Sequence, residues 1–452
     1  MKIRGLRWWV VALVFLAAVL NYVDRQTLSI LAPTIQADLK MDDRDYANVV
    51  NLFLLAYTIA YLISGKLVDR LGTRTGMAFF VVWWSLANLA TAWVHGLRSL
   101  GACRFLLGLG EAGVWPAASK AASEWFPSRE RALAIGFYTM GATVGAMLAP
   151  QIANSLAGYD YAHILPGFVS YFGEGTGWRV AFAVTGIAGL VWLLPWLWLC
   201  RKPAESHAAA TPENAAWSWR KLLSYRPVWL LLLARLLTDP VWYFYQFWFA
   251  KYLNSERGLG QQGLTITWII FAWAGAGSLA GGWLSGRSVK SGKSAPSARL
   301  AVMLGCACLM PVSPLVAQTG DLPLAITLAG CAVFAALAWL INLSALVVDL
   351  VPRHSLGSAF GIVAAGSSLG AMGMNMLVAA MVSGPAKGAA GFLDQAVAKV
   401  AGPLTGMLEG RGYGPWFAIM ACLHPLALLV LWAGRLEKPG APASAGQSGP
   451  AR

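Results

Sequence analysis

The sequence predicts an all-α membrane protein with twelve transmembrane helices in two pseudo-symmetric bundles of six. Of the 452 residues, 58% are hydrophobic and only 12% are charged, and the mean hydropathy is +0.58. Soluble domains carry roughly 25% charged residues, so this composition favours a membrane protein. The chain also contains two glycine-rich hinges of similar sequence, which indicates that its second half duplicates the first.

Twelve apolar segments are long enough to cross a bilayer, which takes about 20 mostly apolar residues in a helix. We expect spans at 8–34, 46–68, 75–94, 99–125, 131–157, 179–200, 227–253, 263–285, 299–317, 323–350, 357–383 and 414–434. A polar linker separates six spans from six. The predicted divisions are an N-terminal bundle at 1–200, a cytoplasmic linker at 201–226, a C-terminal bundle at 227–434 and a cytoplasmic tail at 435–452.

The first hinge, residues 65–74, joins the second and third spans and forces them to be antiparallel neighbours. Its glycines allow the helix ends to approach closely, and its charged side chains can bond helix termini. We therefore expect gating or structural roles for Gly65, Asp69, Arg70, Gly72 and Arg74. A weaker copy of the hinge lies 217 residues later, at 282–287. An acid followed by proline, alanine and glycine also repeats, from 124–136 to 349–361, at an offset of 225.

The net charge of +14 reports membrane topology. On the predicted inner side we count twenty-one Lys and Arg, and on the outer side seven. This positive-inside bias places both termini in the cytoplasm, in a multi-pass protein of a bacterial-type inner membrane. The charge is thus explained without a nucleic-acid partner. The N-terminal apolar run lacks a clear cleavage site and is interpreted as a retained helix.

The cysteines and histidines predict neither a disulfide framework nor a metal site, because the chain has no CxxC motif and no histidine cluster. We expect no cofactor. An enzyme is not expected either, because no nucleophile–base pair and no cofactor-binding loop is found.

Three spans each contain an acid and an arginine. These pairs are Asp24 and Arg25, Arg104 and Glu111, and Arg235 and Asp239. A charge at the bilayer centre costs roughly 2.5–3.5 kcal/mol on insertion scales, so such groups face a partner or a wet cavity. Arg104 and Glu111 are seven residues apart and share a helix face. Arg104 has an alternative role as a tie between helices, whereas Glu111 and Asp24 are expected to be unpaired acids.

These residues also carry a resemblance. The first hinge, with the Arg-Phe-Leu-Leu-Gly of 104–108, resembles the major facilitator superfamily. The segments 21–25, 111–116 and 124–132 are similar to its anion:cation symporter branch. The opening at 2–8 and the segment 238–242 resemble bacterial hexuronate transporters.

The resemblance implies roles for individual residues. It assigns proton coupling to Asp24 and Glu111, and attraction of the substrate carboxylate to Arg25. Burial favours the neutral form of an acid and a nearby cation favours the ionised form, so the protonation of these acids can change during transport. The residues implied to border a sugar-acid site are Tyr22, Tyr57, Trp339 and Asn342. We add Gln246, a polar residue in an aromatic run, although any single aromatic residue has the alternative of facing lipid.

We therefore expect a secondary active transporter, a monomer in the lipid bilayer, that imports a small organic anion by proton symport with alternating access. The expected anion is a sugar acid, either a hexuronate or an aldonate. A ligand sensor, or an exchanger or importer of another carboxylate or sulfonate, is the alternative. Two departures limit the resemblance: residues 141–143 supply no amide where some relatives carry a glutamine, and Gly286 replaces an acid in the second hinge. The long loops at 158–178 and 384–413 have no predicted role.

Overall fold

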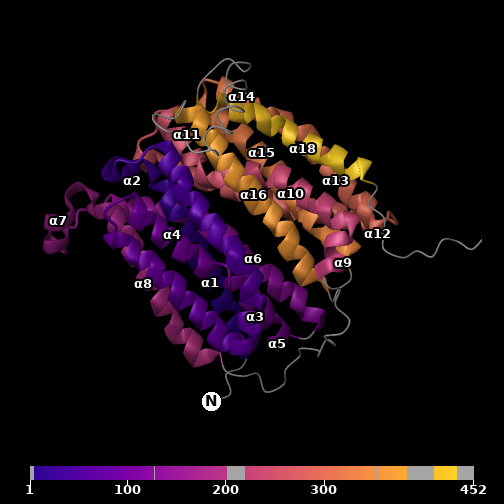
Figure 1. The fold of residues 1–452 in the computed structure, drawn as a ribbon, viewed down its shortest axis with the longest axis horizontal. Coiled ribbons are helices and arrows are strands. Elements are labelled where there is room, and N and C mark those ends of the chain that lie inside the picture. Colours follow the sequence, from indigo (N-terminus) through magenta and orange to yellow (C-terminus); the bar gives the residue numbers. More distant parts are fainter. Residues whose placement is uncertain (1–4, 127, 201–218, 352–354, 384–411, 435–452) are drawn as a thin grey trace, which may run out of the picture.

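The computed structural model describes residues 5–126, 128–200, 219–351, 355–383 and 412–434. It consists of two helical halves, indigo to magenta and pink to yellow in Figure 1, which converge at one end and spread apart at the other. Nine helices of the described residues are long and apolar enough to cross a membrane. The predicted linker lies mostly, and the tail entirely, outside the described residues, so the domain boundaries stay predictions.

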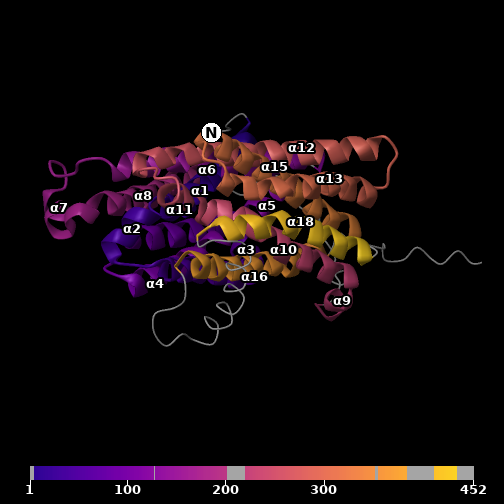
Figure 2. The ribbon, with the colours of Figure 1, turned by 90° about the horizontal axis from the view of Figure 1, so that it is seen from above.

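The helices of the two halves follow the expected order. The N-terminal half contains α1 (Leu6–Ile30), α2 (Ala32–Leu39), α3 (Asp43–Ala90), η1 (Thr91–Trp93), α4 (Leu97–Glu111), α5 (Val114–Trp125), α6 (Ser128–Ala157), α7 (Pro166–Phe172), η2 (Gly173–Gly175) and α8 (Thr176–Leu199). The C-terminal half contains α9 (Trp219–Ser224), α10 (Arg226–Phe247), α11 (Phe249–Ser255), η4 (Gln261–Thr267), α12 (Trp268–Lys290), α13 (Ala295–Leu309), η5 (Met310–Val312), α14 (Ser313–Gln318), α15 (Leu322–Leu350), α16 (Leu356–Ser383) and α18 (Gly414–Ala433). Helix α7, in the first of the long loops, projects from the bundle in both Figure 1 and Figure 2.

Four predicted spans are broken where a continuous α-helix was expected. The first breaks at Leu31, the fourth at 112–113, the seventh at Trp248 and the ninth at the short helix η5. Proline explains the first two of these breaks, because it lacks the N–H that would continue the helical ladder. Pro33 lies in the first turn of α2, and Pro116 in the first turn of α5. The fourth span therefore ends its first helix at Glu111, in the middle of the bundle.

Close packing of small residues supports the duplication. A Cβ atom added to Gly141 or Gly145 of α6 would lie 2.4 or 2.3 Å from a backbone oxygen of α1. At Gly366 and Gly370 of α16 the corresponding distances to α10 are 2.4 and 2.2 Å. These glycines are 225 residues apart, the same offset as the repeated acid–proline pattern. Each half thus packs an equivalent helix pair backbone to backbone, as small residues allow in membranes.

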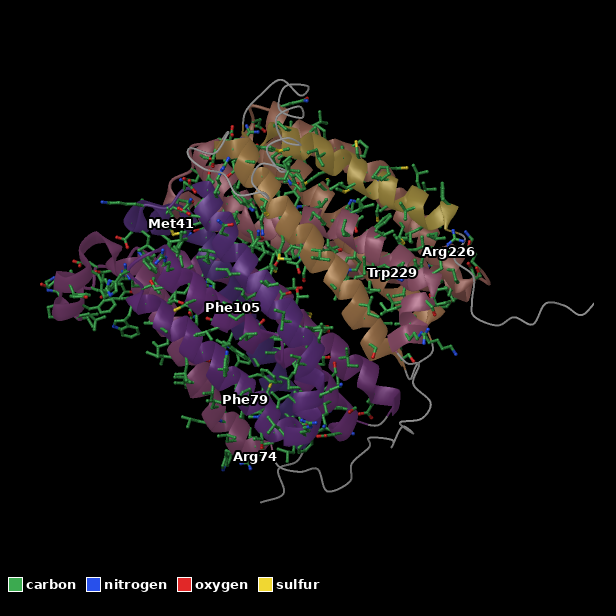
Figure 3. The ribbon with its side chains drawn as sticks, in the orientation of Figure 1. Met41, Arg74, Phe79, Phe105, Arg226 and Trp229 are labelled. Atoms are coloured by element: carbon green, nitrogen blue, oxygen red, sulfur yellow. The ribbon has the colours of Figure 1, made fainter. Side chains whose placement is uncertain are left out.

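The first hinge lies at the end of the N-terminal half that is opposite to Met41 (Figure 3). Helix α3 continues across it, with a kink at Gly72, where φ is 78° and ψ is 163°. A left-handed φ is unfavourable for residues with a Cβ atom, which accounts for glycine here. Arg74 donates to the carbonyl of Leu197 at 2.6 Å, and Trp196 donates to the carbonyl of Arg74 at 2.9 Å. These contacts are compatible with a structural hinge, but gating by Gly65, Asp69, Arg70, Gly72 and Arg74 stays a prediction.

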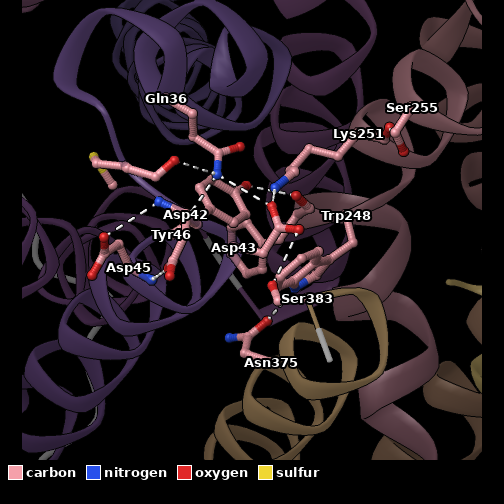
Figure 4. A network of polar contacts seen from close by, with 12 residues as sticks. Gln36, Asp42, Asp43, Asp45, Tyr46, Trp248, Lys251, Ser255, Asn375 and Ser383 are labelled. Atoms are coloured by element: carbon pink, nitrogen blue, oxygen red, sulfur yellow. Dashed lines mark hydrogen bonds and ion pairs between the residues drawn. The ribbon is translucent and has the colours of Figure 1, made fainter. Parts of the chain in front are cut away.

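The opposite end is closed by polar contacts between the halves (Figure 4). Lys251 of α11 forms an ion pair with Asp43, the first residue of α3. The Tyr46 hydroxyl donates to the carbonyl of Phe247 at 2.6 Å. Asn375 of α16 donates to the Asn51 side chain at 2.8 Å. Buried donors thus find acceptors across the two halves at this end.

Candidate functional site

A cavity of about 270 Å³ lies between the two halves. It is bounded by α3 and α5 on one side and by α10 and α16 on the other. Its lining residues are Tyr57, Thr58, Tyr61, Trp115, Arg235, Tyr243, Phe360, Gly361, Ala364, Ala365, Ser367 and Ser368. Small-molecule sites typically have about 300–1,000 Å³, so this cavity suits a small ligand. Aromatic faces, hydroxyl groups and a guanidinium are the groups that recognise a polyhydroxylated anion.

An ion pair is buried beside the cavity. The Nε and Nη2 atoms of Arg25 donate to the same Oε2 atom of Glu111, at 3.0 and 2.7 Å. The side chain of Arg25 is 8% exposed and that of Glu111 is fully buried. Glu111 is therefore paired, and the expectation that it is an unpaired acid is wrong. The two residues lie 86 positions apart, so only the fold brings them together.

Aromatic rings surround the Arg25 guanidinium. Its Cζ atom lies 4.9 Å from the ring centre of Tyr22, 5.2 Å from that of Phe53 and 5.0 Å from that of Tyr57. Such contacts stabilise a desolvated cation. Because Tyr57 also lines the cavity, it lies between the cavity and the ion pair. Tyr22, Arg25, Tyr57 and Glu111, which the sequence analysis singled out, thus form one cluster.

Asp24 has a different partner from its neighbour Arg25. Its Oδ1 atom accepts a hydrogen bond from Asn88 at 2.8 Å, and Asn88 also donates to Thr185 at 2.8 Å. The Oδ2 atom of Asp24 has no hydrogen-bond partner among the described residues. Asp24 is fully buried, so this orphaned oxygen is available to carry a proton without breaking another bond.

Arg104 is buried and interacts electrostatically with both acids, Asp24 and Glu111. Its guanidinium is 4.7 Å from the ring centre of Phe182. Its Nε and Nη2 atoms have no hydrogen-bond partner in the part of the chain that the structure describes. This arrangement is compatible with both roles considered for Arg104, the structural tie and the gating residue.

Of the six predicted substrate residues, Tyr57 lines the cavity, and Tyr22 and Arg25 lie beside it in the aromatic cluster. The other three lie elsewhere. Trp339 packs edge-on against His424, with ring centres 5.1 Å apart, inside the C-terminal half. Asn342 donates to the carbonyls of Gly281 and Ala338 at 3.1 and 2.8 Å. The Gln246 side chain accepts from Gln26 at 3.3 Å, toward the closed end. Substrate binding by Trp339, Asn342 and Gln246 stays a prediction.

Several lining residues were not singled out as substrate contacts. Tyr61, Trp115 and Tyr243 are aromatic residues in spans already rich in them, and Ser367 and Ser368 lie in a helix rich in small residues. Neither pattern distinguishes a cavity position from a packing position. Arg235 did carry a signal as an intramembrane charge, and the structure pairs it with Asp239 one turn later, at 2.7 Å.

Known proteins are similar to this chain in sequence and in fold. Residues 14–375 match the model of the Major Facilitator Superfamily. The hexuronate transporter of Escherichia coli (strain K12) is 27% identical, over 97% of this chain and 96% of its own length. The galacturonate transporter of Dickeya chrysanthemi is 30% identical, over 63% of this chain and 82% of its own length. A bacterial homolog of the human lysosomal transporter Spinster superposes with a TM-score of 0.73 over 96% of both chains, at 21% identity. The predicted two-bundle fold is confirmed.

Proposed function

This chain belongs to the major facilitator superfamily and is a multi-pass secondary transporter, and we propose that it imports a sugar acid, a hexuronate or an aldonate, together with protons. The observation that carries the proposal is the buried Arg25–Glu111 ion pair beside a cavity of hydroxyl and aromatic groups. Relatives named for hexuronate and galacturonate transport support the choice of cargo.

The ion pair supplies a mechanism for coupling. An arginine fork binds a carboxylate strongly, and Glu111 occupies two donors of that fork. Protonation of Glu111 removes its negative charge and weakens its hold on Arg25. The guanidinium then takes the substrate carboxylate in place of the glutamate. Arg25 keeps an anionic partner throughout, which avoids the large cost of an uncompensated charge.

Asp24 provides a second proton site in this proposal. Its orphaned Oδ2 atom accepts a proton while Oδ1 keeps the bond to Asn88. Release on the other side of the membrane completes a symport cycle by alternating access.

The proposal includes the membrane orientation predicted from the charge bias. With both termini on the cytoplasmic side of a bacterial inner membrane, the end closed by Lys251 and Asp43 faces outward. The cavity then opens toward the cytoplasm. A monomer suffices, because the cavity is formed by two halves of one chain.

Uptake of labelled galacturonate into liposomes tests the proposal. We expect accumulation against a gradient when the outside is more acidic, and its collapse on addition of a protonophore. Exchange of labelled for unlabelled galacturonate should survive the protonophore, because exchange needs no net proton flow. Concentrative uptake that depends on sodium and ignores the pH gradient would refute proton coupling. Binding without any transport would favour the alternative of a ligand sensor.

A further inference from the structure

Arg235 is the charged side chain among the described residues that line the cavity. It belongs to α10, in the half opposite to Arg25, and its side chain is 15% exposed. Its Nε atom donates to Asp239 at 2.7 Å. Within the described chain, its two terminal nitrogens make no other hydrogen bond. The planar end of Arg235 is therefore free for bidentate binding of an anion.

Arg25 has fewer free donors on its guanidinium than Arg235 has. It directs both Nε and Nη2 at Glu111, and three aromatic rings enclose its guanidinium. The two arginines are nevertheless equivalent in one respect. Each is ion-paired with an acid of its own half, Arg25 with Glu111 and Arg235 with Asp239. Arg235 lines the cavity directly, and Arg25 lies behind the lining residue Tyr57, whose ring centre is 5.0 Å from its guanidinium. The two cations are thus on opposite halves.

We propose that Arg235 forms a second anion subsite, so that the cavity prefers sugar acids with a carboxylate at each end over those with one. The inference rests on the proposed function, in which Arg25 binds the first carboxylate. Asp239 acts as a positioning residue: it holds Nε and leaves the terminal fork directed to the ligand. The hydroxyls of Tyr61, Ser367 and Ser368, also in the lining, are donors and acceptors for the sugar hydroxyls between the two ends.

A ligand bound in this way joins the two halves. One carboxylate contacts α1 through Arg25, and the other contacts α10 through Arg235. A ligand that binds both halves favours the conformation in which they are close together, since it gains both contacts only there. A monocarboxylate makes only one of the two charged contacts, in addition to the hydrogen bonds of its hydroxyls.

Calorimetry on the purified full-length transporter tests the subsite with two six-carbon probes, galactarate (two carboxylates) and galacturonate (one). We expect wild-type protein to bind galactarate about tenfold more tightly, from one additional charge-assisted contact. Arg235→Gln should abolish this preference, because it should weaken galactarate binding about tenfold more than galacturonate binding. Arg25→Gln should weaken both probes. Arg287→Gln, on the exposed surface of α12, is the matched control and should keep the preference.

The outcomes separate this inference from the proposed function. Equal affinities of wild-type protein for the two acids would overturn the subsite alone. An equal loss of both acids in Arg235→Gln would make Arg235 the anchor of a single carboxylate and would also overturn it. No binding of either acid would overturn the proposed function together with the subsite. If Arg235→Gln does not fold, Arg235→Lys keeps the charge without the fork, and an unchanged preference in that variant would refute bidentate binding.

Discussion

The Arg25–Glu111 pair raises the question of why a membrane protein keeps a buried ion pair. Replacing such a pair by apolar side chains is often neutral or stabilising, so the pair is weak evidence for stability. Its position beside a polar cavity, with the guanidinium wrapped by Tyr22 and Tyr57, instead favours a pair that changes partners. Sequence patterns identified both residues as intramembrane charges. They could not predict the bond, because nothing local connects positions 86 apart.

Arg25→Lys tests the anchor. Lysine keeps the charge but offers a point donor in place of a planar fork, so the bidentate contact is lost. We expect galacturonate binding to weaken by roughly 10- to 100-fold, the equivalent of about 1.5–3 kcal/mol for a charged hydrogen bond. Calorimetry measures it, with Arg287→Lys as the control at an exposed position. An unchanged affinity would place the carboxylate elsewhere, with Arg235 next in line.

Glu111→Gln separates coupling from binding. The amide keeps the shape of a protonated glutamate but releases no proton, so Arg25 stays available to the substrate. We expect sugar-acid binding to persist and concentrative uptake to be lost. Asp24→Asn should also lose concentrative uptake, while the bond to Asn88 is kept through the remaining oxygen. Calorimetry and gradient-driven uptake are measured on the same preparation. Normal uphill transport by Glu111→Gln would remove this residue from the mechanism.

At the scale of elements, apolar length predicted where spans lie but not where they break. The fourth span was expected as one helix at 99–125, yet it divides after Glu111. Pro116 is the local signal for that break, since its ring removes a ladder donor. Gly113 is a second local signal. A Cβ atom added there would lie 2.2 Å from the ring of Phe80. Such close approaches between segments depend on the tertiary fold. A single sequence shows where a small residue stands, but it does not show which segment packs against that residue.

Gly145→Ala tests the backbone contact between α6 and α1. The added Cβ atom would meet the carbonyl oxygen of Val19 at 2.3 Å, so the helices must separate. Overpacking typically costs about 1–3 kcal/mol, and we expect a lower melting temperature in detergent. Gly136→Ala, on the same helix with open space around it, is the matched control. That change should keep or raise the melting temperature, because alanine is the better helix former. Equal effects of the two changes would contradict tight packing at Gly145.

At the scale of the whole molecule, the two halves form a closed end and a cavity that the sequence did not place. Charge bias predicted which side each loop faces, and repeated motifs predicted two halves. Which end is shut depends on contacts such as Lys251 with Asp43, and these residues are more than 200 positions apart. The aromatic rings of Tyr46 and Trp248 flank the Lys251 ammonium, at 5.0 and 5.1 Å. Removal of the carboxylate would leave that cation desolvated and unpaired in the closed form alone.

Asp43→Asn should therefore shift the protein toward the form that is open at this end. Breaking a buried ion pair by removing one partner costs about 3–5 kcal/mol, which corresponds to more than about a hundredfold in the ratio of closed to open molecules. Spin labels on Ala37→Cys and Gly260→Cys, exposed positions of opposite halves, measure the separation in a background without the six native cysteines. We expect longer distances in Asp43→Asn than in the wild-type protein.

Asp321→Asn is the control and should give the wild-type distances. Asp321 is an exposed aspartate that caps α15, and asparagine caps a helix as well as aspartate does. Lys251→Met should open the end less than Asp43→Asn, because methionine leaves no buried cation behind. A distribution unmoved by Asp43→Asn would mean that the hydrogen bonds of Tyr46 and Asn51 hold the halves together without the ion pair.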